Sequence, residues 1–518
     1  MKQSNNLAKE VYKQLRKESW EVLWEREVPR FDAGNAETRL ARVGLVRAIG
    51  VVALEKGTQQ QKRQTREWLA RLLTDQEEKV RRYAMNALPK IGGSVEVEKA
   101  VLDLLDKPEG TREVEQLSHT LSKIGGQATL QKLESLSDGH EVLHAVEQKV
   151  KAQLAREEAP ARIRLTAKIK ATRQLRIHLR SRRGMELFVR EELQRHARLN
   201  GRFKIVRTSP GCVALSALHP FTLQDLYELR TLGSIHFVLG VVAKNEAKQT
   251  QALAKIIASE RTQLLCRKLT QGQPRYRLQF MRVKVSARKV QSIVNEAFLQ
   301  CPDLLNDPRQ SPWAIEIYPE KVGLSVELRP RVLPDPRFTY RKDDVPASTH
   351  PPLAAAMAQL AGVQANDVVW DPFCGSGLEL IERARLGGVA SILATDIDEN
   401  AIEAARLNFA SAGLSNDIVE LRRGDFRNYE KITGIASGSI SLIIANPPLG
   451  RRVRTEDLKG LILELYHIAA KTLCPGGRLV FINPLKIDSP VSSLKLKARH
   501  VVDLGGFDCR VEKWVLAS

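Results

Sequence analysis

The sequence predicts a multidomain chain in which α-helical repeats precede an α+β region and a C-terminal, doubly wound α/β domain. Three observations support this fold class. A helical motif recurs within residues 1–155, short strands and helices follow within residues 165–335, and strands alternate with helices over residues 336–518. A chain of 518 residues is also too long for one hydrophobic core, which agrees with several domains.

The first part, residues 1–155, is predicted to be entirely helical and repetitive. The apolar and glycine positions of Leu121–Gly126 reproduce those of Leu88–Gly93 with an offset of 33 residues, and Leu45–Gly50 is similar to both. The spacing within Asp75–Gly92 resembles that of a HEAT repeat, in which stacked helix pairs bury their apolar stripes against neighbours. We expect this part to stabilise the protein or to bind a protein partner rather than to carry chemistry.

The second part, residues 165–335, is predicted to be an α+β region that follows a charged helix or linker over Lys151–Lys170. Short apolar or alternating runs predict strands at residues 176–179, 212–215, 275–280, 313–318 and 322–328. Helical periodicity predicts an amphipathic helix at residues 184–193 and another helix at residues 221–232.

The chain is strongly basic, with a net charge of +21 and an isoelectric point near 9.8. Residues 151–210 hold 17 Lys and Arg against 5 Asp and Glu, so much of the surplus lies in one block. A solvated face would also explain a charge run, but a surplus of this size favours a polyanionic partner. An anionic membrane is disfavoured because no long apolar segment or lipidation signal accompanies the charge.

The third part, residues 336–518, begins after a proline-rich joint at residues 330–336. Its most informative features are two apolar, β-branched strands that each end in a loop of special chemistry. Val368–Trp370 leads into Asp371–Gly377, and Leu442–Ala445 leads into Asn446–Gly450. The carboxyl ends of strands in open α/β sheets line one crevice, so we expect both loops to face the same ligand.

Together the two loops resemble the pair used by S-adenosylmethionine-dependent amino-methyltransferases, which have a Rossmann-like fold. From Leu175 onward the order of parts is similar to that of THUMP-domain RNA methyltransferases, which methylate guanine N2 in tRNA or rRNA. The resemblance rests on Gly184–Glu186, Leu229–Thr231, Phe338–Arg341 with Pro351–Met357, and Asp371–Gly377. It implies a THUMP-like RNA-binding region at residues 165–335, S-adenosylmethionine as cofactor and RNA as substrate, tRNA before rRNA. The HEAT-like part lies outside the usual pattern of that family.

With this cofactor, the residues expected to bind it are Asp371, Phe373, Cys374, Gly375, Gly377, Asp396, Asp425, Phe426 and Asn446. Asp371 would accept from the ammonium of the amino-acid tail, while the two glycines let the backbone approach the ligand. Asp396 ends a strand and can accept from both ribose hydroxyls. Asp425 would accept from the adenine amino group with Phe426 beside the ring, although a simple turn would also explain this pair.

The loop Asn446-Pro447-Pro448-Leu449 is predicted to be catalytic and to hold the amine that accepts the methyl group. An exocyclic base amine is a poor nucleophile because its lone pair is delocalised into the ring. The Asn446 side-chain oxygen and the Pro447 carbonyl can accept hydrogen bonds from the two N–H groups of the amine. Both oxygens would also stabilise the charge that develops on nitrogen. The family normally has an aromatic residue where this chain has Leu449, so base stacking worth roughly 1–3 kcal/mol is lost.

Other interpretations remain open. Pyrimidine C5 methylation would need a cysteine nucleophile, but Cys374 is better explained as a small apolar residue of the cofactor loop. Asp398 is explained at least as well by helix capping, and His467 by packing or surface exposure. Asn-Pro-Pro also serves adenine N6 and protein glutamine methylation. A catalytically weak or inactive methyltransferase fold acting as an RNA-binding scaffold is the non-enzymatic alternative, which Leu449 favours.

The cellular context follows from the N-terminus and the cysteines. Met1–Asn6 lacks the apolar stretch of a signal peptide. The six cysteines are scattered without a Cys-x-x-Cys pair, which argues against a zinc module and a disulfide framework. The sequence therefore predicts a reduced, cytoplasmic protein without a metal centre.

Overall fold

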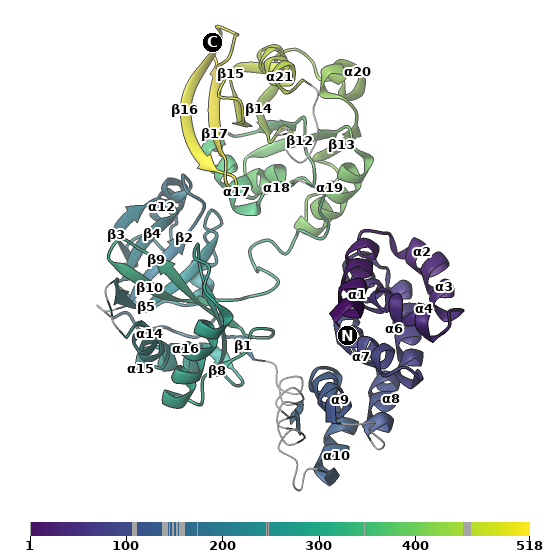
Figure 1. Ribbon diagram of the computed structural model, residues 1–518. Helices are drawn as coiled ribbons and strands as arrows, with labels where there is room; N and C mark the ends of the chain where they lie inside the picture. The colour runs from purple at the N-terminus through teal and green to yellow at the C-terminus, as the bar shows by residue number, and fades with distance from the viewer. Residues whose placement is uncertain are drawn as a thin grey trace. The chain divides into compact units, whose positions relative to one another are not determined.

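The computed structural model describes residues 2–517 apart from 106–110, 137–142, 144–145, 148–149, 152–153, 155–160, 173–174, 245, 247, 347 and 449–456. The chain divides into two compact units, Met1–Pro160 and Ala161–Ser518. Each unit is described by itself (Figure 1).

All the regular elements described in the first unit are helices (Figure 1). Its elements are α1 (Lys2–Leu15), α2 (Trp20–Val22), η1 (Leu23–Glu27), α3 (Val28–Asp32), α4 (Ala36–Ala41), α5 (Gly44–Lys56), α6 (Gln59–Arg71), η2 (Leu72–Thr74), α7 (Glu78–Ile91), α8 (Val95–Leu105), α9 (Thr111–Ile124) and α10 (Gln127–Leu136).

Helices α5, α7 and α9 of this unit pack against one another in series. Gly50 of α5 faces Ala87 of α7, and the Thr120 hydroxyl of α9 donates to the Met85 carbonyl of α7 over 3.2 Å. Leu88–Gly93 and Leu121–Gly126 both lie where their helices end, whereas Leu45–Gly50 lies inside α5. The third copy of the motif is therefore displaced within its helix, because α5 continues past Gly50 with the apolar residues Val51–Leu54.

The second unit contains an eight-stranded sheet in the order β3-β4-β2-β5-β10-β9-β7-β8, within the residues described. Its strands are β2 (Arg176–Arg180), β3 (Phe203–Ser209), β4 (Cys212–Ala217), β5 (Ser234–Ala243), β7 (Arg275–Phe280), β8 (Leu305–Asn306), β9 (Trp313–Pro319) and β10 (Gly323–Pro330), while β1 (Arg162–Ile163) pairs with β6 (Thr270–Gln271). Its helices are α12 (Glu186–Arg195), α13 (Leu223–Leu226), α14 (Gln249–Ile257), α15 (Glu260–Leu269) and α16 (Ala287–Gln300). Ile177 and Leu179 of β2 join a core with apolar residues of all five helices.

The helix expected over residues 221–232 is wrong in length, because α13 ends at Leu226. The chain that follows turns instead of continuing the helix. The Arg337 guanidinium accounts for this change, since it donates to the carbonyls of Leu229 at 3.2 Å and Leu232 at 2.6 Å. A distant side chain thus replaces the hydrogen bonds that a longer helix would supply.

The same unit contains a seven-stranded sheet in the order β13-β12-β11-β14-β15-β17-β16 in the described part. Its elements are α17 (Pro351–Ala361), β11 (Asp367–Asp371), α18 (Leu378–Arg385), β12 (Val389–Asp396), α19 (Glu399–Ala412), β13 (Val419–Arg423), η3 (Phe426–Asn428), α20 (Tyr429–Thr433), β14 (Ile440–Ala445), α21 (Leu458–Thr472), β15 (Leu473–Asn483), β16 (Leu494–Asp503) and β17 (Asp508–Leu516). Helices α17, α18 and α19 cover one face of the sheet, and α20 and α21 cover the other (Figure 1).

The neighbouring strands β13, β12, β11, β14 and β15 pair in parallel, as expected for a doubly wound sheet. The regular alternation predicted to continue to residue 518 is wrong after β15. There β16 and β17 form an antiparallel hairpin, and Gly505 and Gly506 at its turn have φ angles of 101° and 100°. Left-handed backbone of this kind is accessible to glycine at little cost, which explains the turn.

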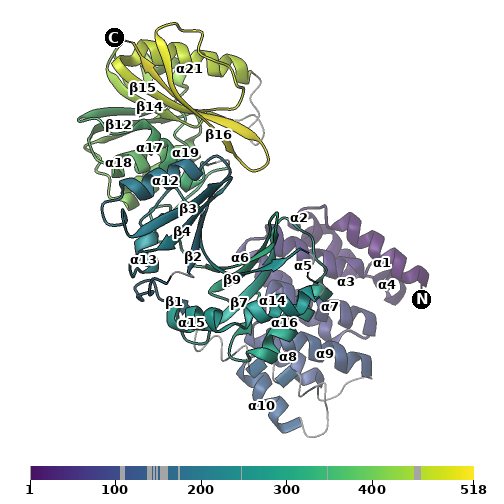
Figure 2. The same cartoon turned by 90° about the vertical axis from the view of Figure 1, so that its left-hand side faces the viewer.

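The two sheets of the second unit share part of one core. Met185 and Phe188, at the start of α12, join the apolar cluster of the seven-stranded sheet. Helix α12 lies next to the β16–β17 hairpin (Figure 2). The Phe188 ring lies 4.8 Å from the His500 ring of β16, between ring centres. The Arg230 guanidinium donates to both carboxylate oxygens of Glu382 in α18 at 2.6 and 2.7 Å. The region of the eight-stranded sheet is therefore fixed directly to α18, the helix that follows the loop Asp371–Gly377.

Candidate active site

The two loops singled out in the sequence lie side by side. Strands β11 and β14 pair in parallel, with Val369 opposite Leu442 and Trp370 opposite Ile443. The loops at Asp371–Gly377 and Asn446–Pro448 therefore leave the same edge of the sheet. This is the position where open α/β sheets bind ligands, at the point where strand order reverses.

The glycine loop after β11 is held by its own backbone geometry and by Asp396. Gly377 has a φ of 81° and precedes α18, and a Cβ atom there would lie 2.9 Å from the Phe409 ring. The N–H of Gly375 donates to Asp396 Oδ2 over 2.9 Å. Asp396 at the end of β12 thus orders the glycine loop. The sequence predicted a contact of Asp396 with a ribose but not this structural role.

Asp371 is fully buried at the end of β11, and its carboxylate is only half satisfied. Oδ1 accepts the N–H of Phe373 over 2.9 Å. Oδ2 is shielded from solvent and accepts no hydrogen bond from a residue that the structure describes. Burial, followed by the nearby Glu379 carboxyl, raises the pKa of Asp371 well above its usual range. A buried acceptor of this kind normally has a partner, so the site is complementary to a cation or donor on a ligand.

Asp396 and Asp398, which lie two residues apart at the end of β12, have different roles in the structure. Asp396 Oδ1 accepts the N–H of Asp398 over 3.0 Å, and its partly exposed carboxylate has a pKa raised by burial. Asp398 accepts the N–H of Asn400 over 3.0 Å and caps α19. The capping interpretation of Asp398 therefore accounts for its position, and Asp396 remains open to a ligand.

The pair Asp425 and Phe426 lies after β13, next to the same edge. Asp425 accepts the N–H of Arg427 over 3.0 Å, which caps the short helix η3. Phe426 is buried, and its ring lies 4.7 Å from that of Phe373, between centres. The less buried Phe373 is the ring of this pair that faces outward.

Asn446, at the end of β14, has one satisfied and one unsatisfied end of its amide. Its Nδ2 donates to the Thr349 hydroxyl over 2.7 Å. Its Oδ1 is shielded from solvent and has no partner among the residues described. Pro447 is buried and Pro448 is half-buried, whereas Leu449 lies outside the described residues.

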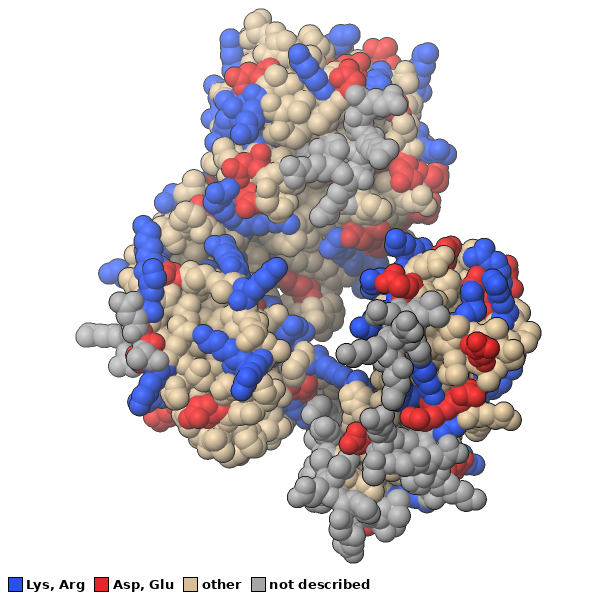
Figure 3. Space-filling model, in the orientation of Figure 1, with Lys and Arg blue, Asp and Glu red and all other residues tan. Residues whose placement is uncertain are grey.

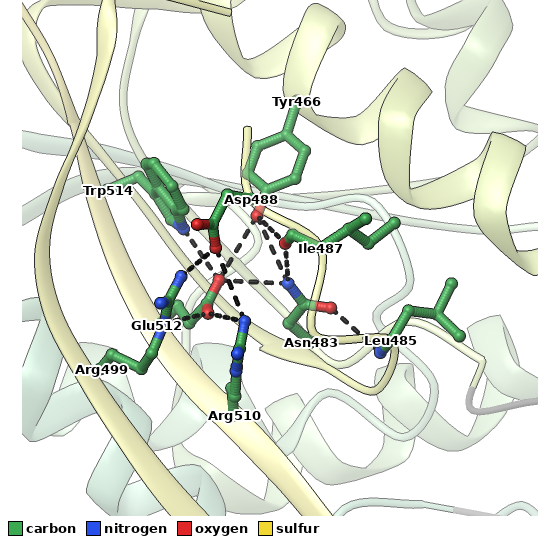
Figure 4. A network of polar contacts seen from close by, with 9 residues as sticks. All are labelled: Tyr466, Asn483, Leu485, Ile487, Asp488, Arg499, Arg510, Glu512 and Trp514. Atoms are coloured by element: carbon green, nitrogen blue, oxygen red, sulfur yellow. Dashed lines mark hydrogen bonds and ion pairs between the residues drawn. The ribbon is translucent and has the colours of Figure 1, made fainter. Parts of the chain in front are cut away.

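A second Asn-Pro pair at the neighbouring strand end provides a contrast. Asn483, at the end of β15, precedes Pro484 but has a fully engaged amide (Figure 4). Its Nδ2 donates to the Ile487 carbonyl over 2.6 Å and to Glu512 over 3.2 Å, and its Oδ1 accepts the N–H of Leu485 over 3.1 Å. Glu512 also accepts from Trp514, so the network is closed. Of these two asparagines, only Asn446 has an oxygen left for a ligand.

Two residues at the site were not foreseen from the sequence. Thr349, before α17, accepts from Asn446 and donates to Glu379, which lies in the first turn of α18. Glu379 is only 3% exposed, and burial raises its pKa to about 7. A carboxylate among the apolar residues Leu378, Leu380 and Ile381 is an unusual feature that could have drawn attention to Glu379.

The remaining candidates agree with a non-nucleophilic site. Burial raises the pKa of the Cys374 thiol well above its usual range, which disfavours the thiolate that a nucleophile needs. His467 is exposed on α21. Within the described residues, no group of three or more His, Cys, Asp and Glu side chains could hold a metal ion. No helix in that same part of the chain is long and apolar enough to span a bilayer.

The basic block contains a segment with a regular exposure pattern. Arg162, Arg164, Lys168 and Lys170 are exposed, while the apolar residues between them, Ile163, Leu165, Ala167 and Ile169, pack on the core of the eight-stranded sheet. These four residues form what we call the basic strap, and none of them makes an ion pair within the described chain. Figure 3 shows Lys and Arg side chains spread over the visible face of the region that contains the eight-stranded sheet.

Comparisons with known proteins agree with this geometry. Residues 339–490 match the family described as RMKL-like, methyltransferase domain. The crystal structure of TrmN from Thermus thermophilus covers 66% of this chain and 100% of its own, with a TM-score of 0.53 and 22% identity. At that identity the likeness shows the fold of the second unit.

Curated relatives match a shorter stretch. The tRNA (guanine(10)-N2)-dimethyltransferase of Methanothermobacter thermautotrophicus is 32% identical over 146 residues, which are 28% of this chain and 40% of that protein. The U6 snRNA (guanine-N(2))-methyltransferase THUMPD2 of Bos taurus is 30% identical over 131 residues, which are 25% of this chain and 24% of that protein. The chain thus spans less than half the length of these relatives. Both ligand loops lie within residues 339–490, the segment that matches the RMKL-like methyltransferase domain.

Proposed function

We propose that this chain is an S-adenosylmethionine-dependent RNA methyltransferase that modifies guanine N2, with tRNA as its substrate. One observation carries the proposal. Two buried oxygens without partners in the described chain, Asp371 Oδ2 and Asn446 Oδ1, lie at adjacent strand ends. One is suited to a cationic cofactor and the other to an amine that donates hydrogen bonds.

The residues around the glycine loop fit S-adenosylmethionine. The cofactor carries an ammonium and a sulfonium, and it supplies the methyl group on that sulfonium. Asp371 and Glu379 are buried carboxyls whose pKa values burial raises, and a bound cation would favour their charged forms. Asp396 is partly exposed at the end of β12 and would accept from the ribose hydroxyls. Phe373 and Asp425 would contact the adenine.

Asn446 and Pro447 would hold the accepting amine. The Asn446 oxygen accepts a hydrogen bond from one N–H of the amine, and the Pro447 carbonyl accepts a hydrogen bond from the other N–H. Both acceptors favour a pyramidal nitrogen with its lone pair directed at the methyl group, and they stabilise the positive charge that develops there. Positioning of the two reactants supplies much of the remaining rate.

The basic strap and the central region would bind the RNA. The order of central and catalytic parts supports the assignment of residues 165–335 as a THUMP-like region. The two curated relatives are named for guanine N2 methylation of tRNA and of U6 snRNA, which supports an RNA substrate. Methylation of rRNA is the alternative substrate. We further propose that the HEAT-like helical part, residues 1–155, binds a protein partner and that the enzyme is cytoplasmic.

The substrate can be tested by mass spectrometry of nucleosides from cells that lack this protein. We expect N2-methylguanosine to fall in the tRNA pool and to be restored by the wild-type chain but not by Asn446→Ala. Loss in the rRNA or small nuclear RNA pool alone would replace tRNA as the substrate. An unchanged level in every pool would favour the scaffold alternative. Leu449→Tyr, which restores an aromatic face for base stacking, should raise the activity of a weak enzyme. The same change would leave an inactive scaffold without activity.

RNA binding can be tested with charge-neutralising changes in the basic strap. Replacing Arg162, Arg164, Lys168 and Lys170 by Gln should weaken tRNA binding and flatten its dependence on salt. Each phosphate contact contributes a slope of roughly −0.7 to −0.9. The matched control replaces Lys9, Lys13, Lys17 and Arg30, which are exposed in the helical unit. Equal effects of the two sets would show that the strap has no special role.

A further inference from the structure

A short chain of hydrogen bonds links the proposed catalytic asparagine to a buried carboxyl group. Asn446 Nδ2 donates to Thr349 Oγ1 over 2.7 Å, and the Thr349 hydroxyl donates to Glu379 Oε1. Thr349 is 7% exposed and Glu379 is 3% exposed. The three residues come from the loop before α17, the start of α18 and the end of β14, so the tertiary fold brings them together.

The direction of this chain follows from the donors that each group has. A threonine hydroxyl has one proton, and a carboxylate has none to give. When Glu379 is ionised, the Thr349 proton must point to Glu379, and Thr349 can then only accept from Asn446. The amide nitrogen of Asn446 therefore faces Thr349, which leaves Oδ1 as the atom that faces away from it.

The opposite direction would disable the site. If Glu379 carried a proton, it could donate to Thr349, and the Thr349 hydroxyl could donate to Asn446 Oδ1. The amide would then turn its two N–H bonds toward the substrate. An amine that also donates hydrogen bonds would meet donors in place of an acceptor.

We propose that Thr349 and Glu379 are positioning residues that orient the Asn446 amide with its oxygen toward the accepting amine. The inference rests on the proposed function, because it concerns the same site. It assigns neither residue a contact with the reacting atoms. Two unlinked features support it: Asn446 Oδ1 has no partner in the described chain, and the equivalent amide of Asn483 is saturated on both ends.

Glu379 is the member of this chain that can change its charge near neutral pH. Burial raises its pKa to about 7. The groups that face it are Asp371, Cys374, Tyr340, Thr349 and Glu382. Cys374 and Tyr340 have raised pKa values and stay neutral, and Glu382 is paired with Arg230. Asp371 is the neighbouring carboxyl whose pKa is also raised by burial, and variants at Thr349 and Glu379 can separate its titration from that of Glu379.

The first test compares Thr349→Val and Thr349→Ser in the full chain with tRNA. Valine keeps the volume but removes the hydroxyl, whereas serine retains it. One hydrogen bond that selects between two orientations changes their ratio by about tenfold, so its loss reduces the share of the active orientation from about nine tenths to about a half. We therefore expect kcat to fall about twofold in Thr349→Val with cofactor affinity unchanged, and to be near wild type in Thr349→Ser. Wild-type kcat in Thr349→Val, with Asn446→Ala inactive, would overturn the proposal.

The second test follows the pH profile of kcat. In the wild type, turnover should fall as pH decreases through the Glu379 transition, because protonation permits the reversed chain. Glu379→Gln should lower kcat at pH 8 and remove this step. Thr349→Val should also remove it, although both carboxyls of the site remain. If the fall of kcat at low pH persists unchanged in Thr349→Val, the titrating group is Asp371. That result would contradict the proposed link from Glu379 through Thr349 to Asn446.

A third test needs no activity and so remains valid if the proposed function is wrong. In protein labelled with ¹⁵N-asparagine, the Asn446 side-chain amide signal can be identified from its loss in Asn446→Asp. We expect this signal to shift with pH in the wild type and to lose that shift in Glu379→Gln. Its position should also change in Thr349→Val. An identical signal in all three proteins would overturn the inference, whereas inactivity of the wild type on every RNA would affect only the proposed function.

Discussion

Asp367 and Asp371 lie at opposite ends of strand β11, and both carboxylates are fully buried, but their surroundings differ completely. Asp367 accepts from Arg383, from Arg478 and from the Ser441 hydroxyl at 2.7 Å. These partners hold its pKa below the usual value despite burial, whereas the pKa of Asp371 is raised. One strand thus carries a saturated acid at its start and an open acid at its end. Burial alone does not mark a functional carboxylate, but burial without partners does.

The comparison predicts its largest effect at Asp367. Asp367→Asn should destabilise the protein by about 3–5 kcal/mol, because Arg383 and Arg478 would remain buried without a counter-charge. Asp371→Asn should leave the stability of the cofactor-free protein unchanged or increased, and should abolish cofactor binding. Chemical denaturation and calorimetry measure the two properties. Equal destabilisation by the two substitutions would contradict the distinction.

The second prediction concerns the open amide. Asn446→Ala should reduce methyl transfer by about 10²–10³ while cofactor affinity is retained, since one oriented acceptor at a developing charge is lost. Asn483→Ala should instead lower stability, because its amide supports the closed network around Glu512. Transfer assays and thermal unfolding of both variants provide the check. Full activity in a folded Asn446→Ala protein would show that another group holds the amine.

The third prediction lies between these cases, because Asp396 is partly satisfied. Its carboxylate already accepts from Gly375 and Asp398, but it remains open to a ligand. Hydrogen bonds to a charged group contribute about 1.5–3 kcal/mol each, so Asp396→Ala should weaken cofactor binding by about one to two orders of magnitude. Calorimetry should show this loss. Unchanged affinity would leave Asp396 with its loop-ordering role alone.

The smallest predicted effect is the pH dependence of stability. A carboxyl group whose pKa is raised by folding stabilises the folded state below its ordinary pKa, and this contribution is lost as pH rises through the folded value. For Glu379 the window runs from about 4.3 in the unfolded chain to about 7 in the folded chain. The Tm of the cofactor-free protein should therefore fall more steeply over this window in the wild type than in Glu379→Gln. Parallel curves in differential scanning calorimetry would contradict the raised pKa.

The sequence indicated the open groups better than the groups that support them. Asp371 and Asn446 could be predicted because each directly follows a buried strand, where local patterns place it at the ligand edge. Thr349 could not, because it lies 97 residues before Asn446 and has no recognisable local motif. The missed turn at residues 227–233 has the same origin, since it depends on Arg337 more than 100 residues later. Contacts of that sequence separation are specified by the complete fold.

The junction between α12 and the β16–β17 hairpin has a consequence for how the chain folds. The Arg183–Asp508 ion pair spans 325 residues, and any side chain at position 184 would collide with the Val501 carbonyl. During synthesis, Phe188 leaves the ribosome long before β16, so the face of its ring that packs on His500 stays uncovered until the last strands are made. Contacts of such long range slow folding and leave an intermediate open to aggregation. The order of synthesis therefore makes completion of the hairpin the late step that joins both sheets.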